Sequence, residues 1–246
     1  MRVNLKIAAC SKETGALLKE YLEDRGLTID PNAAIDICYG VRSSKPKRLN
    51  GKAGGGDKIL NMTLMDKGGC RTVPWFEGDK IPKGFKFPAL ARMITGHGGE
   101  DIVPVFQAQE VFWRLKAGFS WFSSYVPVAT EYRVWIFRDE CLGVYEKVMN
   151  RPGDYAYIGR NFRNGFDFEP VVVQPKAAVA QAKLATRALS FDFGAVDLLL
   201  GEDNLPYVLE CNTAPGVIKS GAQATLAKLA DRMVAWVHAG CPERGY

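Results

Sequence analysis

Apolar and polar positions near the start of the chain follow the pattern of a strand, a helix and a second strand. An apolar run at Val3–Cys10 predicts a strand, and Ser11 is placed to cap a helix that continues to Leu22 and stops before Gly26. A second apolar run at Ala33–Gly40 predicts another strand. This order indicates an α/β opening. No G-x-G-x-x-G motif joins the first strand to its helix, so a dinucleotide site has no support.

A basic, glycine-rich segment at Val41–Lys58 follows this opening. Such a segment is most often a solvated loop, and contact with phosphates or nucleic acid is the alternative. The next apolar positions predict a short helix that Gly68 and Gly69 end. The region from Pro74 to Pro88 is expected to connect it to the rest with little regular structure.

From residue 87 onward, short apolar runs and longer amphipathic stretches alternate, without an internal repeat. The expected strands are one through Leu90 and Met93, one at Ile102–Phe106, one at residues 121–128, and a hairpin over 130–150 that turns near Arg138–Glu140. The expected helices are Glu110–Lys116, Pro175–Leu189 and Ala222–His238.

Two further strands, Phe191–Leu200 and Leu205–Asn212, flank the turn G-E-D-N. In this pairing Asp197 lies opposite Glu210 or the residue before it. Glu210 and Asn212 share a face because they are two residues apart on one strand. The two carboxylates and the carboxamide are therefore expected to converge.

Two carboxylates about 4 Å apart repel by roughly 4 kcal/mol at an effective dielectric near 20, and a divalent cation removes that cost. Ligation by carboxylate and amide oxygens suits Mg²⁺, which commonly takes substrate phosphates as further ligands. An exposed hairpin whose polar residues face water is the alternative. The apolar neighbours of these residues favour the metal site.

The segment G-H-G-G-E-D at residues 96–101 is a candidate phosphate binder. Gly96, Gly98 and Gly99 would let backbone N–H groups approach phosphate oxygens, although an ordinary glycine turn fits equally well. His97 could contact a phosphate or act as a base, but a lone loop histidine is more often neither. Arg92 precedes the segment at the end of a strand, where a guanidinium could bind a phosphate.

Arg133 stands inside an apolar strand of the predicted hairpin, and a buried arginine needs an anionic partner. Glu131 and Asp192 are structural candidates for that partner, and a phosphate is equally suitable. Lys147, across the same hairpin, is a comparable phosphate ligand, with a solvated lysine as the alternative.

Composition is that of an ordinary globular domain, with 246 residues, 47% hydrophobic and 24% charged. The formal net charge of +5 permits an anionic partner without requiring one. The six cysteines are scattered without a C-x-x-C pair, which argues against zinc and favours free thiols in the cytoplasm. The apolar run at the start is too short for a signal peptide, and no stretch is long enough to span a bilayer, so no membrane partner is expected.

Three segments taken in order carry a resemblance to a known superfamily: Arg92 with G-H-G-G-E-D-I, then T-E-Y-R-V-W-I-F, then F-D-F-G-A-V-D-L-L-L with Y-V-L-E-C-N-T-A-P-G. Their order resembles the ATP-grasp superfamily, most of all carboxylate–amine ligases from bacteriophage genomes, which are similar to ribosomal-protein glutamate ligases. The resemblance covers residues 87–238, and residues 3–74 are similar only in outline.

The resemblance implies an ATP-grasp fold, in which two α+β subdomains grip ATP, preceded by a small α/β domain. The implied boundaries are 1–87 for the N-terminal domain, 88–126 for the small subdomain and 127–246 for the C-terminal subdomain. The implied activity joins a carboxylate to an amine through an acyl phosphate and releases ADP and phosphate, with ATP and Mg²⁺ required. The two substrates could be an amino acid, a peptide, a protein or a modified nucleobase.

The resemblance also assigns roles to residues. The implied metal ligands are Asp197, Glu210 and Asn212; the implied ATP ligands are Arg92, Gly96, His97, Gly98, Gly99, Tyr125, Glu131 and Lys147; and the implied catalytic residues are Arg133, Arg160 and Asn161. Arg163–Asn164 fits the last position as well as Arg160–Asn161 does. Arg92 stands where the superfamily usually has lysine, and only Glu131 is near the position of an acid for the ribose.

Two other functions compete with the ligase. A grasp-fold kinase would transfer phosphate without an amine step. A non-catalytic module that binds nucleotide or nucleic acid would use the basic loop at 42–58, but would have no need of three converging metal ligands. The expected location is the cytoplasm, which would be the host cytoplasm for a phage-encoded protein, and a homodimer is one assembly that the resemblance allows.

Overall fold

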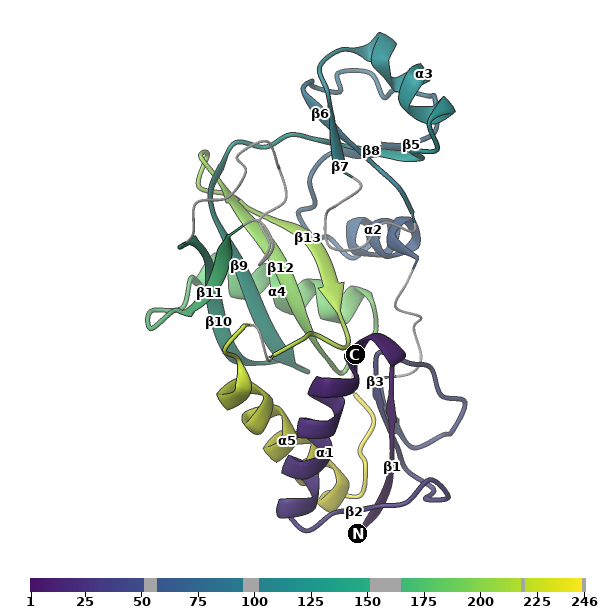
Figure 1. The fold of residues 1–246 in the computed structure, drawn as a ribbon, viewed down its shortest axis with the longest axis vertical. Coiled ribbons are helices and arrows are strands. Elements are labelled where there is room, and N and C mark those ends of the chain that lie inside the picture. The colour runs from purple at the N-terminus through teal and green to yellow at the C-terminus, as the bar shows by residue number, and fades with distance from the viewer. Residues whose placement is uncertain (51–56, 95–101, 151–164, 218–219, 245–246) are drawn as a thin grey trace.

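The computed structural model describes residues 1–50, 57–94, 102–150, 165–217 and 220–244. The strands of these residues form three sheets, which follow one another along the long axis of the molecule in Figure 1. The N-terminal sheet lies at the bottom of that view, a five-stranded sheet in the middle and a smaller sheet at the top. None of the described helices combines the length and the apolar character of a membrane span.

The N-terminal sheet is parallel, with strand order β2-β1-β3-β4. Its strands are β1 (Arg2–Ile7), β2 (Thr28–Ile29), β3 (Asp36–Tyr39) and β4 (Arg48–Leu49). Helix α1 (Lys12–Asp24) connects β1 to β2, which confirms the α/β opening. The first strand is shorter than predicted, because a 3-10 turn, η1 (Ala9–Ser11), precedes α1.

Ser11 is the N-cap residue of α1 as predicted, but its side chain makes no capping hydrogen bond, since its hydroxyl donates to the carbonyl oxygen of Ala214, 3.1 Å away. The basic segment after β3 is not simply a solvated loop either. It contains β4, and the ammonium group of Lys45 lies 2.9 Å from the carboxylate of Asp36 on β3. Residues 51–56 of this segment lie outside the described residues.

Asp36 is fully buried and is surrounded by four polar side chains. Its carboxylate accepts hydrogen bonds from Asn4 at 3.0 Å and Ser43 at 2.5 Å, and lies 2.9 Å from the ammonium groups of both Lys6 and Lys45. Burial alone would raise the pKa of this carboxyl, but the contacts with Lys6, Ser43, Lys45 and Asn4 hold it well below the ordinary value.

This low pKa predicts an acid-sensitive contribution to stability. The unfolded chain binds a proton at Asp36 near pH 3.9, whereas the folded chain resists protonation, so the contribution is present above that pH and is lost as the pH falls. We expect the melting temperature of the wild type to exceed that of Asp36→Asn at pH 6, and the difference to shrink below about pH 4. Thermal unfolding of both proteins between pH 6 and pH 2 measures this, and a difference independent of pH would contradict it.

The small sheet is antiparallel, with strand order β5-β8-β6-β7. Its strands are β5 (Trp75–Glu77), β6 (Ala89–Arg92), β7 (Ile102–Val105) and β8 (Trp121–Ser124). Helix α3 (Ala108–Lys116) packs on it through Val111, which shares a core with Phe76 and Phe122. The expectation of an irregular connection after Pro74 is wrong at β5, which pairs with β8.

The five-stranded sheet is antiparallel, with strand order β11-β10-β9-β12-β13. Its strands are β9 (Val128–Phe137), β10 (Glu140–Met149), β11 (Phe166–Pro170), β12 (Phe193–Gly201) and β13 (Pro206–Asn212). The predicted hairpin with its turn after Phe137 is confirmed, and so is the pairing of the last two strands.

Three helices border this sheet: α2 (Lys58–Lys67), α4 (Lys176–Ala188) and α5 (Gln223–His238). On the α4 side the middle of the sheet is apolar, with Val134 and Val196 buried. On the other side, Trp135 and Phe193 join a core that includes α5, α1 and the N-terminal sheet. Beyond this core, the same side of the sheet carries polar residues.

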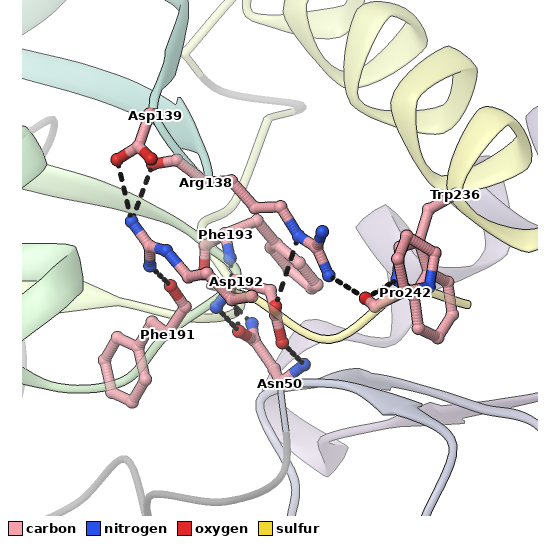
Figure 2. Close-up of polar contacts among 9 residues, drawn as sticks. Asn50, Arg138, Asp139, Phe191, Asp192, Phe193, Trp236 and Pro242 are labelled. Atoms are coloured by element: carbon pink, nitrogen blue, oxygen red, sulfur yellow. Dashed lines mark hydrogen bonds and ion pairs between the residues drawn. The ribbon is translucent and has the colours of Figure 1, made fainter. Parts of the chain in front are cut away.

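Asn50 joins the N-terminal sheet to the five-stranded sheet, as Figure 2 shows. Its Oδ1 accepts from the backbone N–H groups of Asp192 at 2.7 Å and Phe193 at 3.2 Å. Its Nδ2 donates to the carbonyl of Phe193 at 2.9 Å, and its own N–H donates to the Asp192 carboxylate at 2.8 Å. The residue is buried and has a φ of 55°, a conformation that asparagine tolerates better than most residues.

Replacement of Asn50 by alanine should therefore reduce the free energy of unfolding by about 3 kcal/mol, because three buried backbone groups lose their partners. Asn204 is the matched control, since it has a φ of 60° but stands in an exposed turn. Asn204→Ala should cost only about 1 kcal/mol, the strain of the left-handed conformation. Urea unfolding of both variants measures the difference, and equal losses would mean that the side-chain hydrogen bonds contribute nothing.

The C-terminal segment closes the same junction (Figure 2). The carbonyl oxygen of Pro242 accepts from the guanidinium of Arg138 at 2.6 Å and from the indole of Trp236 at 2.9 Å. Arg244 donates to the carbonyl of Phe191 at 2.5 Å and to that of Arg138 at 3.1 Å. The turn between β9 and β10 is thus held between the C-terminus and the start of β12.

Candidate functional site

A row of polar side chains crosses the five-stranded sheet. Arg133 on β9 lies opposite Asp197 on β12, and Asp197 lies opposite Glu210 on β13. On the other side of β9, Lys147 on β10 lies opposite Phe168 on β11. Directly opposed residues of antiparallel strands point to the same face, so these side chains gather on one side. The predicted pairing of Asp197 is confirmed, with Glu210 as its partner.

Arg133 and Asp197 form a two-pronged ion pair. The guanidinium Nε lies 2.7 Å from Oδ1 and Nη2 lies 2.8 Å from Oδ2. Asp197 is only 4% exposed, so this charge is held inside the protein. Neither Glu131 nor Asp192, the structural partners expected from the sequence, is hydrogen-bonded to Arg133; the carboxylate across the sheet takes that place.

Lys147 is buried and lies between two carboxylates. Its ammonium group contacts the carboxylate of Glu131 directly and lies 3.4 Å from Oδ2 of Asp197. The alternative of a solvated lysine is therefore wrong. Glu131 is buried as well and pairs with Lys147, and its contact with a ribose stays a prediction.

Electrostatics keep Asp197, Arg133 and Lys147 ionised. Burial alone would raise the pKa of Asp197, but the charges of Arg133 and Lys147 overcome it and lower that pKa to about 2. Burial alone would lower the pKa values of Arg133 and Lys147, but the neighbouring carboxylates raise both. Two buried cations and two buried anions thus compensate one another.

Phe168 forms one wall of this cluster. Its ring centroid lies 4.6 Å from the guanidinium carbon of Arg133 and 5.7 Å from the ammonium nitrogen of Lys147, both within reach of cation–π attraction. Phe168 and its strand are not among the elements predicted from the sequence. The alternation F-D-F-E from Phe166 has the period of a strand and is the sequence signal for it.

Glu210 and Asn212 lie at the edge of the row, on the last strand. The carboxamide of Asn212 donates to Oε1 of Glu210 at 2.8 Å, and Glu210 is exposed. Asp197 is paired directly with Glu210 across the two strands, so two carboxylates and a carboxamide share one face. A carboxylate has about four lone-pair sites, so Asp197 keeps acceptor capacity beyond its contacts with Arg133 and Lys147.

This oxygen donor set is of the kind that Mg²⁺ takes, with the amide as the third ligand. In the described part of the chain, no three His, Cys, Asp or Glu side chains gather in a way that could hold a metal ion. A Mg²⁺ site at this position therefore needs the carboxamide of Asn212 as its third protein ligand. The neighbouring Cys211 is buried, and burial raises the pKa of its thiol, which agrees with a packed thiol and not a nucleophile.

Arg92 belongs to the small sheet and approaches the row from there. Its guanidinium lies 5.1 Å from the ring of Trp121 and donates to the hydroxyl of Ser123 at 3.2 Å. Burial lowers its pKa, and the charges of Glu210 and Glu131 oppose that shift. Arg92 on the small sheet is thus within electrostatic range of two carboxylates on the five-stranded sheet.

Tyr125 stands in the connection between β8 and β9, where the chain passes from the small sheet to the five-stranded sheet. Its backbone N–H donates to the carbonyl of Pro88 at 2.9 Å, and its ring is 43% exposed. Its contact with ATP stays a prediction. The other predicted site residues, Gly96, His97, Gly98, Gly99, Arg160, Asn161, Arg163 and Asn164, lie outside the described residues.

The loop after Asn212 contacts the N-terminal sheet. The hydroxyl of Tyr39 donates to the carbonyl of Pro215 at 2.5 Å. Gly40 has a φ of 78°, and a Cβ atom there would lie 2.6 Å from that of Ala214, so only glycine allows this approach. The ends of β1 and β3 therefore border the site.

Sequence comparison finds no matching family model. Curated relatives include D-alanine–D-alanine ligases from Clostridium botulinum (strain Eklund 17B / Type B), 25% identical over 179 residues, and Methylacidiphilum infernorum (isolate V4), 27% identical over 184 residues. The alignments cover 65% and 70% of this chain, and 58% and 60% of the relatives. The chain thus spans somewhat less than two thirds of the relatives' length.

Similar solved structures cover nearly the whole chain. The D-alanine–D-alanine ligase from Bacillus anthracis has a TM-score of 0.69 at 16% identity, covering 98% of this chain and 99% of that one. The ATP-grasp ligase PsnB complexed with minimal precursor has a TM-score of 0.69 at 12% identity, covering 95% and 98%. A Chryseobacterium gregarium RiPP-associated ATP-grasp ligase, in complex with ADP and a leader and core peptide, has a TM-score of 0.66 at 12% identity, covering 100% and 98%.

Proposed function

We propose that this chain, which has the ATP-grasp fold, is an ATP-dependent ligase that joins a carboxylate to an amine and releases ADP and phosphate. The observation that carries the proposal is the row of charged side chains on the five-stranded sheet, with Arg92 approaching from the small sheet. A site of this kind suits a polyphosphate, because cations and oxygen ligands for a metal lie side by side.

An amino acid or a peptide is the proposed source of both the carboxylate and the amine. Support comes from relatives named D-alanine–D-alanine ligase and from structural neighbours complexed with precursor peptides. Within the superfamily, the order of the sequence motifs favours the phage-type carboxylate–amine ligases that are similar to ribosomal-protein glutamate ligases.

The proposed reaction has two steps. A carboxylate oxygen of the first substrate attacks the γ-phosphorus of ATP, the bond from that phosphorus to the bridging oxygen breaks, and ADP leaves with the electron pair. The amine then attacks the carbonyl carbon of the acyl phosphate, loses a proton, and displaces phosphate to leave an amide. Arg133, Lys147 and Arg92 supply positive charge for the phosphate oxygens, and Asp197 and Glu131 keep two of these cations in place.

Asp197, Glu210 and Asn212 would hold Mg²⁺, which when bound neutralises charge on the phosphate oxygens. The glycine-rich segment at 96–99 is proposed to close over the phosphates, and Tyr125 to lie in the segment that contacts adenine. Arg160 and Asn161 are proposed to lie near the reacting carboxylate.

We also propose three functional units, with boundaries close to residues 87 and 126. Because β5 pairs with β8, the first boundary is better placed before Trp75, so that the small subdomain includes all four strands of its sheet. The second boundary falls in the connection from Tyr125 to β9.

The test is product analysis with ATP, Mg²⁺ and pools of D- and L-amino acids and short peptides, with hydroxylamine added to trap an acyl phosphate as the hydroxamate. We expect ADP, phosphate and a hydroxamate whose formation depends on one pool. AMP in place of ADP would exclude the acyl-phosphate route.

Two other outcomes identify the competing functions. A stable phosphorylated product without amide would indicate a kinase. Absence of turnover, together with nucleic-acid binding that survives Glu210→Gln and falls steeply with salt, would indicate a binding module.

A further inference from the structure

Helix α3 and the connection that leads into it from β7 present three large aromatic side chains to solvent. Phe106, Phe112 and Trp113 are 67%, 52% and 65% exposed. Helix α3 turns Val111 and Leu115 towards the sheet, so the intervening positions point outward. Figure 1 shows α3 at the upper end of the molecule, beyond the strands of the small sheet. We call Phe106, Phe112, Trp113 and the neighbouring Lys116 the aromatic face.

Aromatic residues are enriched at protein interfaces, and grouped exposed apolar side chains often mark such a site. The core of the small sheet does not need the three exposed aromatic side chains, since Val111, Phe76 and Phe122 are already buried in it. The aromatic face is therefore available for a partner.

The surroundings of the aromatic face are basic. The segment at residues 78–88 packs on the same core as α3 through Ile81, Phe85 and Phe87. It and α3 together expose four lysines: Lys80, Lys83, Lys86 and Lys116. Among the described residues, the acids in or next to these two segments are Glu77, Asp79 and Glu110, and the Glu110 carboxylate already accepts from the N–H of Phe106 at 3.2 Å. An acidic partner is thus favoured, and a second copy would bring lysines against lysines.

Ring geometry distinguishes a polypeptide from a nucleic acid. The ammonium of Lys116 lies over both rings, 4.4 Å from the centroid of Phe112 and 5.8 Å from that of Trp113. The two rings meet edge to face, with centroids 5.3 Å apart and planes at 74°. Bases stack on free ring faces. Here the ammonium of Lys116 lies over the rings, where it competes with a stacking base, whereas a carboxylate would pair with it.

We propose that the aromatic face docks a polypeptide segment that carries both carboxylates and apolar side chains. Phe112 and Trp113 contact the apolar side chains, and Lys116 with the lysines of residues 78–88 pairs with the carboxylates. The inference goes beyond the proposed ligase reaction and does not depend on it, because docking requires neither ATP nor the polar row.

The probe is a random copolymer of glutamate and tyrosine, titrated by fluorescence anisotropy without nucleotide. Phe112→Ser/Trp113→Ser should weaken binding at least tenfold, that is by about 1.4 kcal/mol or more. The matched control is Val172→Ser/Val173→Ser, which removes two exposed apolar side chains outside the aromatic face and should leave binding unchanged. Circular dichroism checks that both variants are folded.

Four outcomes would overturn the proposal. The first is equal binding by wild type and the aromatic variant, and the second is equal binding of polyglutamate, which would mean charge attraction alone. The third is tighter binding of oligo-dT that the aromatic variant loses, which would assign the face to single-stranded nucleic acid. The fourth is a wild-type dimer, by light scattering, that the same variant converts to a monomer.

Discussion

Replacement of Glu210 by glutamine should reduce the rate of ADP formation about 10³-fold, since losing a metal ligand removes several kcal/mol of charge stabilisation. The affinity for ATP should fall in the presence of Mg²⁺ and stay unchanged in EDTA. Because Glu210 is exposed, the free energy of unfolding should change by no more than about 0.5 kcal/mol. Steady-state ADP release and ATP titrations with and without Mg²⁺ measure these effects.

Glu202 provides the matched control, because it is an exposed glutamate on the turn between the same two strands. Glu202→Gln makes the same change in net charge and should leave both turnover and ATP affinity unaltered. An equal loss of turnover and ATP affinity in the two variants would indicate a general effect of net charge. Full activity of Glu210→Gln would remove Glu210 from the metal site and require a different ligand set.

Strands with a long apolar pattern could be located from the sequence, and very short ones could not. β12 and β13 join through a tight turn, so their pairing follows from the turn and the apolar run on each side. β2 and β4 have only two residues each, which is too few for a period to be read. β5 has only three residues and stands in a proline-rich segment, so its period cannot be read from the sequence either.

The two strand pairings that place Asp197 in the row of polar side chains also differ in whether the sequence predicts them. The pairing of Asp197 with Glu210 is fixed by a local turn, so the sequence could predict it. The pairing of Asp197 with Arg133 joins β12 to β9 across more than fifty residues, and no turn sets that register. From the sequence, only a metal ion is therefore expected to balance the charge of Asp197, whereas in the structure Arg133 and Lys147 already provide two positive charges.

Replacement of Lys147 by methionine should reduce the free energy of unfolding by about 3–5 kcal/mol, the usual cost of removing one partner from a buried ion pair. Methionine fills a similar volume without charge, so the loss is mainly electrostatic. The buried carboxylate of Glu131 would lose its ammonium partner, and Asp197 would keep only Arg133. Urea unfolding followed by circular dichroism measures the change.

The double variant Lys147→Met/Glu131→Leu should regain most of that loss, because it removes both charges of the Lys147–Glu131 pair together. Arg232→Met is the matched control: Arg232 pairs with Glu140 at 2.5 and 2.6 Å, but both side chains are 46% exposed. Water screens that pair, so its loss should cost no more than about 1 kcal/mol. If Lys147→Met cost no more than Arg232→Met, or if the double variant were less stable than the single one, the buried cluster would not be held together by compensated charge.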